Sequence, residues 1–284
     1  MEVASTVAEM RALRRTYAGD VGFVPTLGYL HAGHVSLLRA SREHNEHTVA
    51  SIFVNPTQFN RSDDFDSYPR DVDGDLAQLR EQGVDVVFVP PVEEMYPDGP
   101  KISVEVAEIT ERLEGAHRPG HFAGVTTIVS KLFSIVEPTR AYFGKKDAQQ
   151  LAVIRRLVAD RHLDVEIVGM PTIREPDGLA LSSRNARLSP EERKAALVLS
   201  KALRQAAERY GEGERDGEVI RKAMLALIAD EALARVDYVS VADTRTLDEL
   251  DSITGDALVS LAVQIGDVRL IDNVTLPNDA EELS

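Results

Sequence analysis

Short apolar runs alternate with helical patterns through the first 170 residues of this chain, and no other feature restricts its possible folds as strongly. Five runs read as strands, at residues 21–25, 48–54, 84–89, 140–143 and 164–168. Four segments between them have a helical pattern, at residues 34–43, 71–82, 124–136 and 147–160. Strands that alternate with helices indicate βαβ units around a parallel sheet with right-handed crossovers. We therefore predict a doubly wound α/β fold that binds ligands at the carboxyl ends of its strands.

The pattern changes after about Thr172, where the regular alternation stops. Ser189 followed by Pro190 is a strong helix start, because serine caps the free N–H groups and proline suits the first turn. Long helical patterns rich in Ala and Leu follow, and then two strand-like runs at residues 236–242 and 257–265. We predict two domains, a Rossmann-like domain at residues 1–172 and a smaller α+β domain at residues 173–284.

Composition excludes several classes of protein. The 284 residues include no Cys, which rules out disulfides, thiolate metal sites and a Cys nucleophile. No run approaches the 18 apolar residues of a membrane span, and the net charge of −15 argues against nucleic acid or an anionic membrane as a partner. Residues 1–10 lack the cationic start and apolar run of a signal peptide, so we expect a cytoplasmic protein.

The first candidate site is residues 25–34, P-T-L-G-Y-L-H-A-G-H, where the first predicted strand gives way to a helix. Doubly wound folds bind nucleotides at this position, and a helix amino terminus suits phosphate. Gly28 and Gly33 permit close approach of a ligand to the backbone. His31 and His34 can both donate hydrogen bonds to charge that develops at one phosphorus. Two ordinary surface histidines explain the pair alone equally well, and a zinc site is a weaker interpretation because no third ligand is obvious.

Two further segments combine polar side chains with predicted element ends. Residues 53–59, F-V-N-P-T-Q-F, follow the second strand, and the amides of Asn55 and Gln58 can hold hydroxyl and carboxylate groups without adding charge. Residues 114–124 form a Gly-rich stretch in which Arg118 can clamp an anion. An ordinary polar loop and a helix entry with solvated basic residues are the respective alternatives.

The last two segments carry most of the candidate cations. Residues 143–150, F-G-K-K-D-A-Q-Q, join a strand to a helix, where a lysine can bind phosphate and Asp147 can cap the helix. Residues 181–185, L-S-S-R-N, place two hydroxyls and an arginine in a loop that can close over a triphosphate. A solvated interdomain loop is the alternative for this segment. Each of the five segments is weak evidence alone, but chance does not readily assemble all of them in one chain.

Together these segments resemble the pantoate–β-alanine ligase (pantothenate synthetase) family, which belongs to the nucleotidylyltransferase superfamily with the H-x-G-H signature. The likeness runs from Val24 to Asn273. The motifs P-T-L-G-Y-L-H-A-G-H, F-V-N-P-T-Q-F, R-P-G-H-F, F-G-K-K-D-x-Q-Q and L-S-S-R-N occur in the order and spacing of the family. H-x-G-H alone is moderately specific, whereas the five motifs together are highly specific.

The resemblance implies a two-step ligation that leads to pantothenate and coenzyme A. The pantoate carboxylate would attack the α-phosphate of ATP to give pantoyl adenylate and pyrophosphate, and the amine of β-alanine would then displace AMP. The resemblance also implies Mg²⁺ with the ATP, a homodimer, a first domain that binds nucleotide and pantoate, and a second domain that closes over the ATP site. The protein would act mainly by positioning and charge stabilisation.

The same resemblance assigns roles to particular residues. His31 and His34 would contact ATP phosphates, with His34 as proton donor. Lys146 would neutralise the pentavalent phosphorus, and Arg184 would bind the triphosphate. The other implied nucleotide contacts are Leu27, Gly28, Tyr29, Leu30, Ala32, Gly33, Gly144, Lys145, Asp147, Ile173, Leu181, Ser182 and Ser183. The implied contacts to pantoate or β-alanine are Gln58 and Gln150, followed by Asn55, Tyr68 and Arg118, and no residue is assigned as a metal ligand.

Three positions depart from the pattern expected of the family. Leu27 replaces Met, Tyr29 replaces a smaller residue, and Lys145 replaces Glu. Leucine nearly conserves the volume of methionine, whereas Lys145 adds charge beside Lys146 and leaves its own role open. Two alternatives to the ligase remain. One is another adenylate-forming or nucleotidyl-transferring enzyme of the superfamily, and the other is a non-catalytic nucleotide-binding regulator or scaffold.

The negative charge of the chain is unevenly distributed along the sequence. Residues 62–98 carry 11 acids and 2 bases, and residues 211–284 carry 17 acids and 6 bases. The rest of the chain, which contains all five segments, therefore carries an excess of five bases. Because nearby charges dominate the potential of a site, we expect a locally basic site within an acidic protein.

Overall fold

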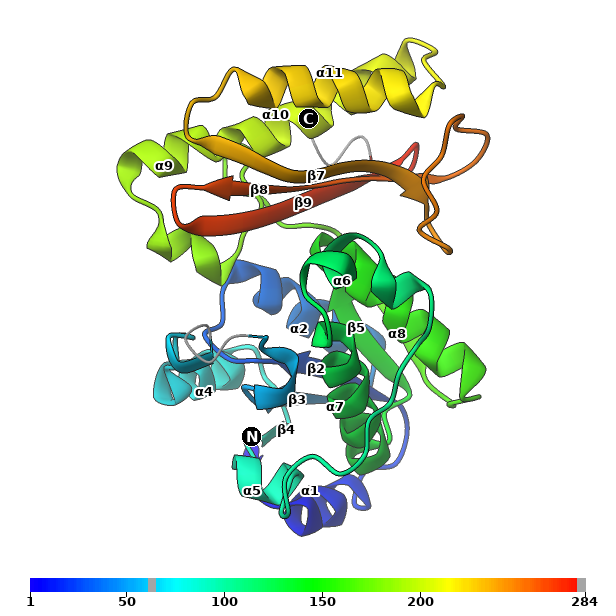
Figure 1. Cartoon of the computed structure of the whole chain (residues 1–284). Helices are drawn as coiled ribbons and strands as arrows, with labels where there is room; N and C mark the ends of the chain where they lie inside the picture. The colour runs from blue at the N-terminus through cyan, green and yellow to red at the C-terminus, as the bar shows by residue number, and fades with distance from the viewer. Residues whose placement is uncertain (61–64, 280–284) are drawn as a thin grey trace. The chain divides into compact units, whose positions relative to one another are not determined.

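The computed structural model describes residues 1–60 and 65–279. They form two compact units (Figure 1). The first comprises Met1–Gly144 and Gln150–Met170, and the second comprises Lys145–Gln149 and Pro171–Ser284. Within the described part of the chain, no helix is long and apolar enough to cross a membrane.

The first unit is built on a six-stranded parallel sheet with the order β1-β4-β3-β2-β5-β6. Its strands are β1 (Glu2–Ala4), β2 (Val21–Thr26), β3 (His47–Ile52), β4 (Val86–Phe88), β5 (Arg140–Gly144) and β6 (Glu166–Met170). The chain runs outward from β2 through β3 to β4 and then returns to β5 on the other side of β2. Ligands of doubly wound sheets bind at such a reversal of strand order. The predicted doubly wound α/β fold is confirmed.

Helices cover both faces of this sheet because its strands are apolar on both sides. One face packs against α2 (Ala32–His44) and α4 (Val72–Glu81), and the other against α1 (Val7–Arg14), α7 (His121–Val136) and α8 (Ala148–Asp160). Neighbouring residues of β2 show the alternation, since Phe23 joins the second of these cores and Val24 the first. The loops contain the short helices α5 (Val92–Met95) and α6 (Leu113–His117) and the 3₁₀ turns η1 (Pro56–Gln58) and η2 (Ile109–Glu111).

Strand β1 and helix α1 were not among the predicted elements. The sequence carried a signal for α1, because Thr6 and Glu9 form a capping box. The Thr6 hydroxyl accepts from the Glu9 N–H, and the Glu9 carboxylate accepts from the Thr6 N–H. Strand β1 has only three residues, and its pairing with β4 is a tertiary contact that local patterning does not reveal.

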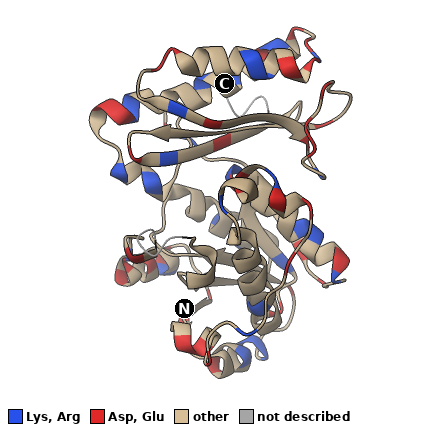
Figure 2. Cartoon of the chain, viewed as in Figure 1, with Lys and Arg blue, Asp and Glu red and all other residues tan. Residues whose placement is uncertain are grey.

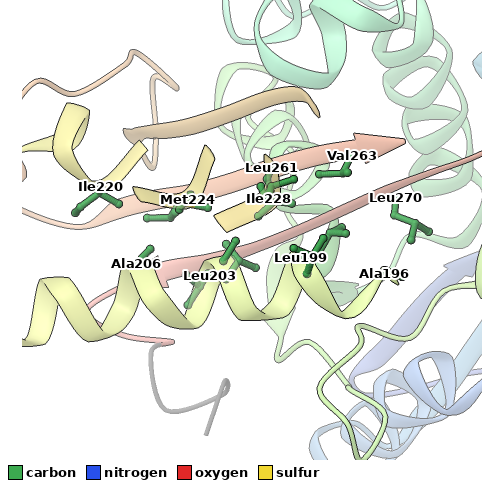
Figure 3. Close-up of a cluster of buried hydrophobic side chains, with 14 of the residues drawn as sticks. Ala196, Leu199, Leu203, Ala206, Ile220, Met224, Ile228, Leu261, Val263 and Leu270 are labelled. Atoms are coloured by element: carbon green, nitrogen blue, oxygen red, sulfur yellow. The ribbon is translucent and has the colours of Figure 1, made fainter. Parts of the chain in front are cut away.

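The second unit packs helices on one face of an antiparallel sheet with the order β7-β8-β9. Its elements are η3 (Lys145–Asp147), η4 (Ser183–Arg187), α9 (Pro190–Ala195), α10 (Leu197–Gly211), α11 (Gly217–Ala229), β7 (Ala234–Asp243), β8 (Ala257–Ile265) and β9 (Val268–Leu276). Leu203 of α10, Met224 of α11 and Leu261 of β8 meet in its core (Figure 3). The predicted smaller α+β fold and the helix start at Ser189 are both confirmed.

Strand β9 is the main element of the second unit that the sequence did not predict. Arg269, Asp272 and Asn273 interrupt its apolar pattern, so the run does not read as a strand by composition. All three residues bind other parts of the same unit: Arg269 pairs with Asp237 of β7 at 2.6 Å, and the contacts of Asp272 and Asn273 are described below. The strand follows β8 through a tight turn in which Ile265 pairs with Val268.

Candidate active site

The second residue of the loop after β2 is Gly28, which no other residue can replace without strain. Thr26 Oγ1 donates to the Ser51 carbonyl at 2.7 Å and accepts from the Gly28 N–H at 3.1 Å. Gly28 has φ +84°, and a Cβ there would lie 2.9 Å from Asp75 Oδ2 and 3.0 Å from Ile52 Cγ2. The loop therefore passes close over buried groups in a left-handed conformation that favours glycine.

A buried carboxylate from α4 binds the next two residues of this loop. Asp75 is 2% exposed, and its two oxygens accept from the Tyr29 N–H at 2.8 Å and the Leu30 N–H at 2.7 Å. Tyr29 has φ +53°, which is unusual for a residue with a side chain. Sequence reasoning missed Asp75 because an acid in the first turn of a helix normally indicates only a favourable interaction with the helix dipole.

His31 and His34 lie side by side at the amino terminus of α2. His31 is the N-cap, its Nδ1 accepts from the Gly33 N–H at 3.1 Å, and His34 Nδ1 accepts from the His31 N–H at 3.3 Å. The ring centroids are 4.1 Å apart. Because Nδ1 is the acceptor in both rings, the proton of each neutral imidazole lies on Nε2.

The cap geometry also explains the glycine between the two histidines. A Cβ at Gly33 would lie 2.9 Å from the His31 ring, so a side chain there would displace the cap. The site thus combines the N–H groups of a helix amino terminus with two imidazoles that carry protons on Nε2. This arrangement suits a phosphate group on which negative charge develops.

The second predicted segment orients a glutamine. Asn55 is fully buried, and its Oδ1 accepts from the Tyr96 hydroxyl at 2.9 Å. Burial raises the pKa of Tyr96, which keeps this hydroxyl protonated as a donor. Asn55 Nδ2 donates to Gln58 Oε1 and to the Gly124 carbonyl, each at 3.1 Å. Because Oε1 of Gln58 is the acceptor in this contact, its Nε2 is the end that suits an oxygen of another molecule.

The third predicted segment packs directly against the second. Gly124 of α7 lies so close to η1 that a Cβ there would be 2.4 Å from the Thr57 carbonyl oxygen and 2.6 Å from the Gln58 nitrogen. His121 Nδ1 lies 2.7 Å from the Gln58 carbonyl oxygen, and Arg118 Nη1 lies 3.5 Å from His121 Nε2. The structure therefore brings Asn55, Gln58 and Arg118 into one neighbourhood of the first unit.

Tyr68 belongs to the same neighbourhood through an aromatic contact. Its ring meets the ring of Phe59 edge to face, with centroids 5.7 Å apart, and Phe59 directly follows Gln58. Of the remaining candidates of the first unit, Gly144 ends β5 beside Met170 of β6, and Gln150 lies half-buried in the first turn of α8. Gly144 and Gln150 therefore belong to the first unit, but they lie on β5 and α8 and not beside η1 in the sequence.

In the second unit, residues of β9 and the chain after it hold the two lysines that follow β5. Asn273 Nδ2 donates to the Lys145 carbonyl at 3.1 Å and to the Lys146 carbonyl at 2.7 Å. Lys145 Nζ lies 2.6 Å from Asp279 Oδ1, so its charge is paired. The Lys145 position, where the family pattern expects Glu, thus carries an ion pair beside Lys146 instead of an isolated second cation.

The same strand holds the segment that contains the remaining candidates. Arg174 forms a two-pronged ion pair with Asp272, at 2.7 and 3.0 Å, and both side chains are buried. The Leu181 N–H donates to the Ile173 carbonyl at 2.9 Å, and Ser182 Oγ accepts from the Arg184 N–H at 3.3 Å to cap η4. The adjacent residues Asp272 and Asn273 therefore link this segment to the lysines, and sequence reasoning had singled out neither of their roles.

Charge follows the uneven distribution that the sequence indicated. Acidic residues gather on α4 and α5, whereas η4 carries the basic residues Arg184 and Arg187 (Figure 2). Across residues 1–60 and 65–279, no three His, Asp or Glu side chains are grouped as metal ligands.

Comparison with known proteins gives consistent matches over almost the whole chain. The family model for pantoate–β-alanine ligase matches residues 2–275. The chain is 57% identical to pantothenate synthetase from Roseiflexus sp. (strain RS-1), over 97% of this chain and 99% of that protein. It is 56% identical to pantothenate synthetase from Acetivibrio thermocellus, over 96% of this chain and 99% of that protein.

Two solved structures also match. Pantothenate synthetase from Thermus thermophilus superposes with a TM-score of 0.92 at 48% identity, covering 96% of this chain and 99% of that one. Pantoate–β-alanine ligase from Francisella tularensis, complexed with β-γ ATP and β-alanine, superposes with a TM-score of 0.81 at 36% identity, covering 96% of this chain and 97% of that one.

Proposed function

The chain belongs to the pantoate–β-alanine ligase family, and we propose that it joins pantoate to β-alanine in a reaction that consumes ATP. The observation that carries this proposal is the pair His31 and His34 at the amino terminus of α2. The pair follows β2, where the strand order of the sheet reverses, and both imidazoles carry their protons on Nε2. The ligand of the Francisella tularensis relative, an ATP compound with β-alanine, supports the same substrates here.

The proposed reaction has two steps. A carboxylate oxygen of pantoate attacks the α-phosphorus of ATP, and the bond to the bridging oxygen breaks to release pyrophosphate. The amine of β-alanine then attacks the acyl carbon of pantoyl adenylate and displaces AMP, losing a proton as the amide forms. Charge grows on the phosphate oxygens in the first step, and positioned donors lower its barrier.

Each unit supplies groups that suit this chemistry. We propose that His31 and His34 donate from Nε2 to ATP phosphates, with His34 as the proton donor. Gln58, oriented by Asn55, would hold pantoate through Nε2, and Gln150, Tyr68 and Arg118 would add contacts to the small substrates. In the second unit, Lys146 and Arg184 would bind the phosphates as cations.

The remaining nucleotide contacts are proposed on the resemblance of their motifs to the family. They are Leu27, Gly28, Tyr29, Leu30, Ala32, Gly33, Gly144, Lys145, Asp147, Ile173, Leu181, Ser182 and Ser183. We also propose that residues 1–172 bind nucleotide and pantoate while residues 173–284 close over the ATP. A homodimer and a cytoplasmic location complete the proposal.

Mg²⁺ is proposed as a companion of the nucleotide. This ion is commonly held by substrate phosphates with one or two protein oxygens, and it would neutralise phosphate charge. Removing free Mg²⁺ with EDTA should then abolish turnover, and added Mg²⁺ should restore it. Full turnover in EDTA would remove Mg²⁺ from the proposal without touching the identity of the substrates.

A turnover assay with ATP, pantoate and β-alanine tests the function directly. We expect AMP and pyrophosphate to form only when pantoate is present, and pantothenate to form only when β-alanine is added. Formation of ADP, or turnover that is indifferent to pantoate, would refute the proposal. Replacing pantoate with other small hydroxy acids separates this ligase from another adenylate-forming enzyme, because only pantoate should support full turnover.

A further inference from the structure

The loop between β2 and α2 contains two successive residues in the left-handed region of backbone conformation. Gly28 has φ +84° and Tyr29 has φ +53°. Glycine adopts this conformation freely, but a residue with a Cβ does so only when its surroundings hold it there. The loop leads directly into His31, the N-cap of α2, so its path sets the position of the histidine pair.

The side chain of Asp75 holds the loop in this conformation. It uses both oxygens, one for the Tyr29 N–H at 2.8 Å and the other for the Leu30 N–H at 2.7 Å. Because only 2% of the Asp75 surface is exposed, water has little access to these two hydrogen bonds. A buried carboxylate that loses its hydrogen-bond donors is unfavourable, so the two bonds oppose any other path of the loop.

The position of Asp75 on helix α4 explains why its carboxylate can hold the loop rigidly. It lies in the first turn of α4, whose helix dipole favours a negative charge at that end. Helix α4 packs on the sheet through Leu79, in the same core as Leu37 and Leu38 of α2. The carboxylate is therefore carried by a rigid element of the first unit and not by the loop that it binds.

We propose that Asp75 is a positioning residue for the ATP-dependent step. Its carboxylate binds the N–H groups of Tyr29 and Leu30 and so holds the left-handed turn at residues 28 and 29. The path of this loop places His31 and His34 so that both Nε2 atoms can reach the same phosphate group. This role rests on the function proposed above. Asp75 contacts no reacting atom and acts only through the loop.

The chemistry of the contact requires a carboxylate in particular. An aspartate offers two acceptors to two N–H donors. An asparagine of the same shape offers one acceptor, and its NH₂ group would face the second backbone donor. Asp75→Asn therefore weakens the hold on the loop while it nearly conserves volume.

The test compares Asp75→Asn with a matched control on the same helix. Asp71 caps α4 by accepting from the Gly74 N–H at 3.0 Å, whereas the N–H groups of Tyr29 and Leu30 donate to Asp75. Asp71→Ala should therefore weaken α4 without releasing residues 28–30. We expect Asp75→Asn to lower kcat/KM for ATP about 100-fold, the scale of a small misplacement of reacting groups. The KM for β-alanine should stay within about twofold of the wild type, since Asn55 holds Gln58 of η1 through contacts that do not involve Asp75.

Amide hydrogen exchange supplies a readout that does not depend on turnover. In the wild type, the Tyr29 and Leu30 amides should exchange slowly although they lie in a loop, and in Asp75→Asn they should exchange at least tenfold faster. The measurement on the wild type alone covers the case in which the variant does not fold. Rapid exchange of these two amides in the folded wild type would overturn the proposal.

The kinetic outcomes are equally distinct. Wild-type kcat/KM for ATP in folded Asp75→Asn, or an equal loss in Asp71→Ala, would overturn the positioning role. If the function proposed above is wrong, the result is different, because the wild type itself would then form no AMP from ATP, pantoate and β-alanine. In that case the exchange rates still report whether Asp75 holds the loop.

Discussion

The two units hold their candidate phosphate-binding groups by opposite backbone contacts. In the first unit, N–H groups of the histidine loop (residues 27–34) donate to side-chain oxygens of Thr26 and Asp75. In the second unit, the lysine turn η3 presents carbonyl groups, and the amide of Asn273 donates to them. Both segments join a strand to a helix, β2 to α2 and β5 to α8, so the difference lies in which backbone groups of each segment find a side-chain partner.

In both units, contacts to the backbone position the candidate phosphate-binding side chains. The imidazoles of the histidine loop use Nδ1 for backbone N–H groups and keep their protons on Nε2. In the lysine turn, Asn273 binds the carbonyl of Lys146 and leaves the ammonium group uninvolved in that contact. Rigid placement of a site needs such supporting contacts on stable elements.

We expect the largest effect from removing Asp272, because its contact with Arg174 supports the second unit. Asp272→Ala would leave the buried Arg174 guanidinium without its partner, which typically costs about 3–5 kcal/mol of unfolding free energy. Urea unfolding followed by circular dichroism measures the change. Asp267→Ala, in the turn between β8 and β9, serves as the control and should change stability little. A loss below about 1 kcal/mol in Asp272→Ala would show that the pair adds little to this unit.

The next effect concerns the histidine loop. His34→Ala should lower kcat about 100-fold or more, because a donor to the developing charge is lost. The substitution also removes the acceptor for the His31 N–H, so His34→Asn is the matched variant, since its side-chain oxygen can still accept from a backbone donor. Both variants should lose similar activity in steady-state assays. Near-normal turnover of either folded protein would contradict the assigned role of His34.

A smaller effect is expected where α7 meets η1. Gly124→Ala places a methyl group 2.4 Å from the Thr57 carbonyl oxygen, so the two elements must separate. We expect a loss of about 1–3 kcal/mol in thermal or urea unfolding, with a raised KM for pantoate because Gln58 shifts. Gly211→Ala at the end of α10 is the control, since a Cβ there meets open space. Its stability should be equal or slightly higher, and equal stability of the Gly124 variant would refute the tight contact.

The smallest effect is a pH dependence in the second unit. Hydrogen bonding from Arg193 holds the pKa of Asp177 below its ordinary value of 3.8. A lowered carboxylate pKa stabilises the folded state above the ordinary value, and this stability is lost as pH falls through the folded pKa. Because Asp177 is 45% exposed, solvent limits the effect to about 0.2–1 kcal/mol.

Urea unfolding of the wild type and Asp177→Asn between pH 6 and pH 2.5 measures this contribution. The wild type should be slightly more stable at pH 6, and the difference should shrink as the pH falls below about 4. A difference that stays constant over this range would contradict a contribution from ionised Asp177. Arg193 keeps its contact to Glu175 at 2.6 Å in both proteins, which isolates the effect of the single carboxyl.

The elements that sequence patterning predicted are those with strong local signals. The five apolar runs became β2 to β6, and Ser189 caps α9 as predicted, because apolar periodicity and capping act within a few residues. Strands β1 and β9 were missed. The first is short, and in the second Arg269, Asp272 and Asn273 obscure the apolar pattern.

The candidate site shows the same division. The motifs singled out His31, His34, Gln58 and Lys146 as candidates, and their roles stay predictions. The motifs did not identify Asp75, whose partners Tyr29 and Leu30 lie more than 40 residues away in the sequence. Nor did they identify the role of Asn273, whose partners Lys145 and Lys146 lie more than 120 residues away in the sequence.

The sequence alone thus determined the fold class, the two kinds of unit and the residue types available for phosphate and carboxylate binding. Tertiary structure decided how those residues are held, through the carboxylate of Asp75, the amide of Asn55 and the side chains of Asp272 and Asn273. The physical reason is one of range. Periodicity and capping are local properties of the chain, whereas the partner of a buried polar group is chosen only when distant segments pack together.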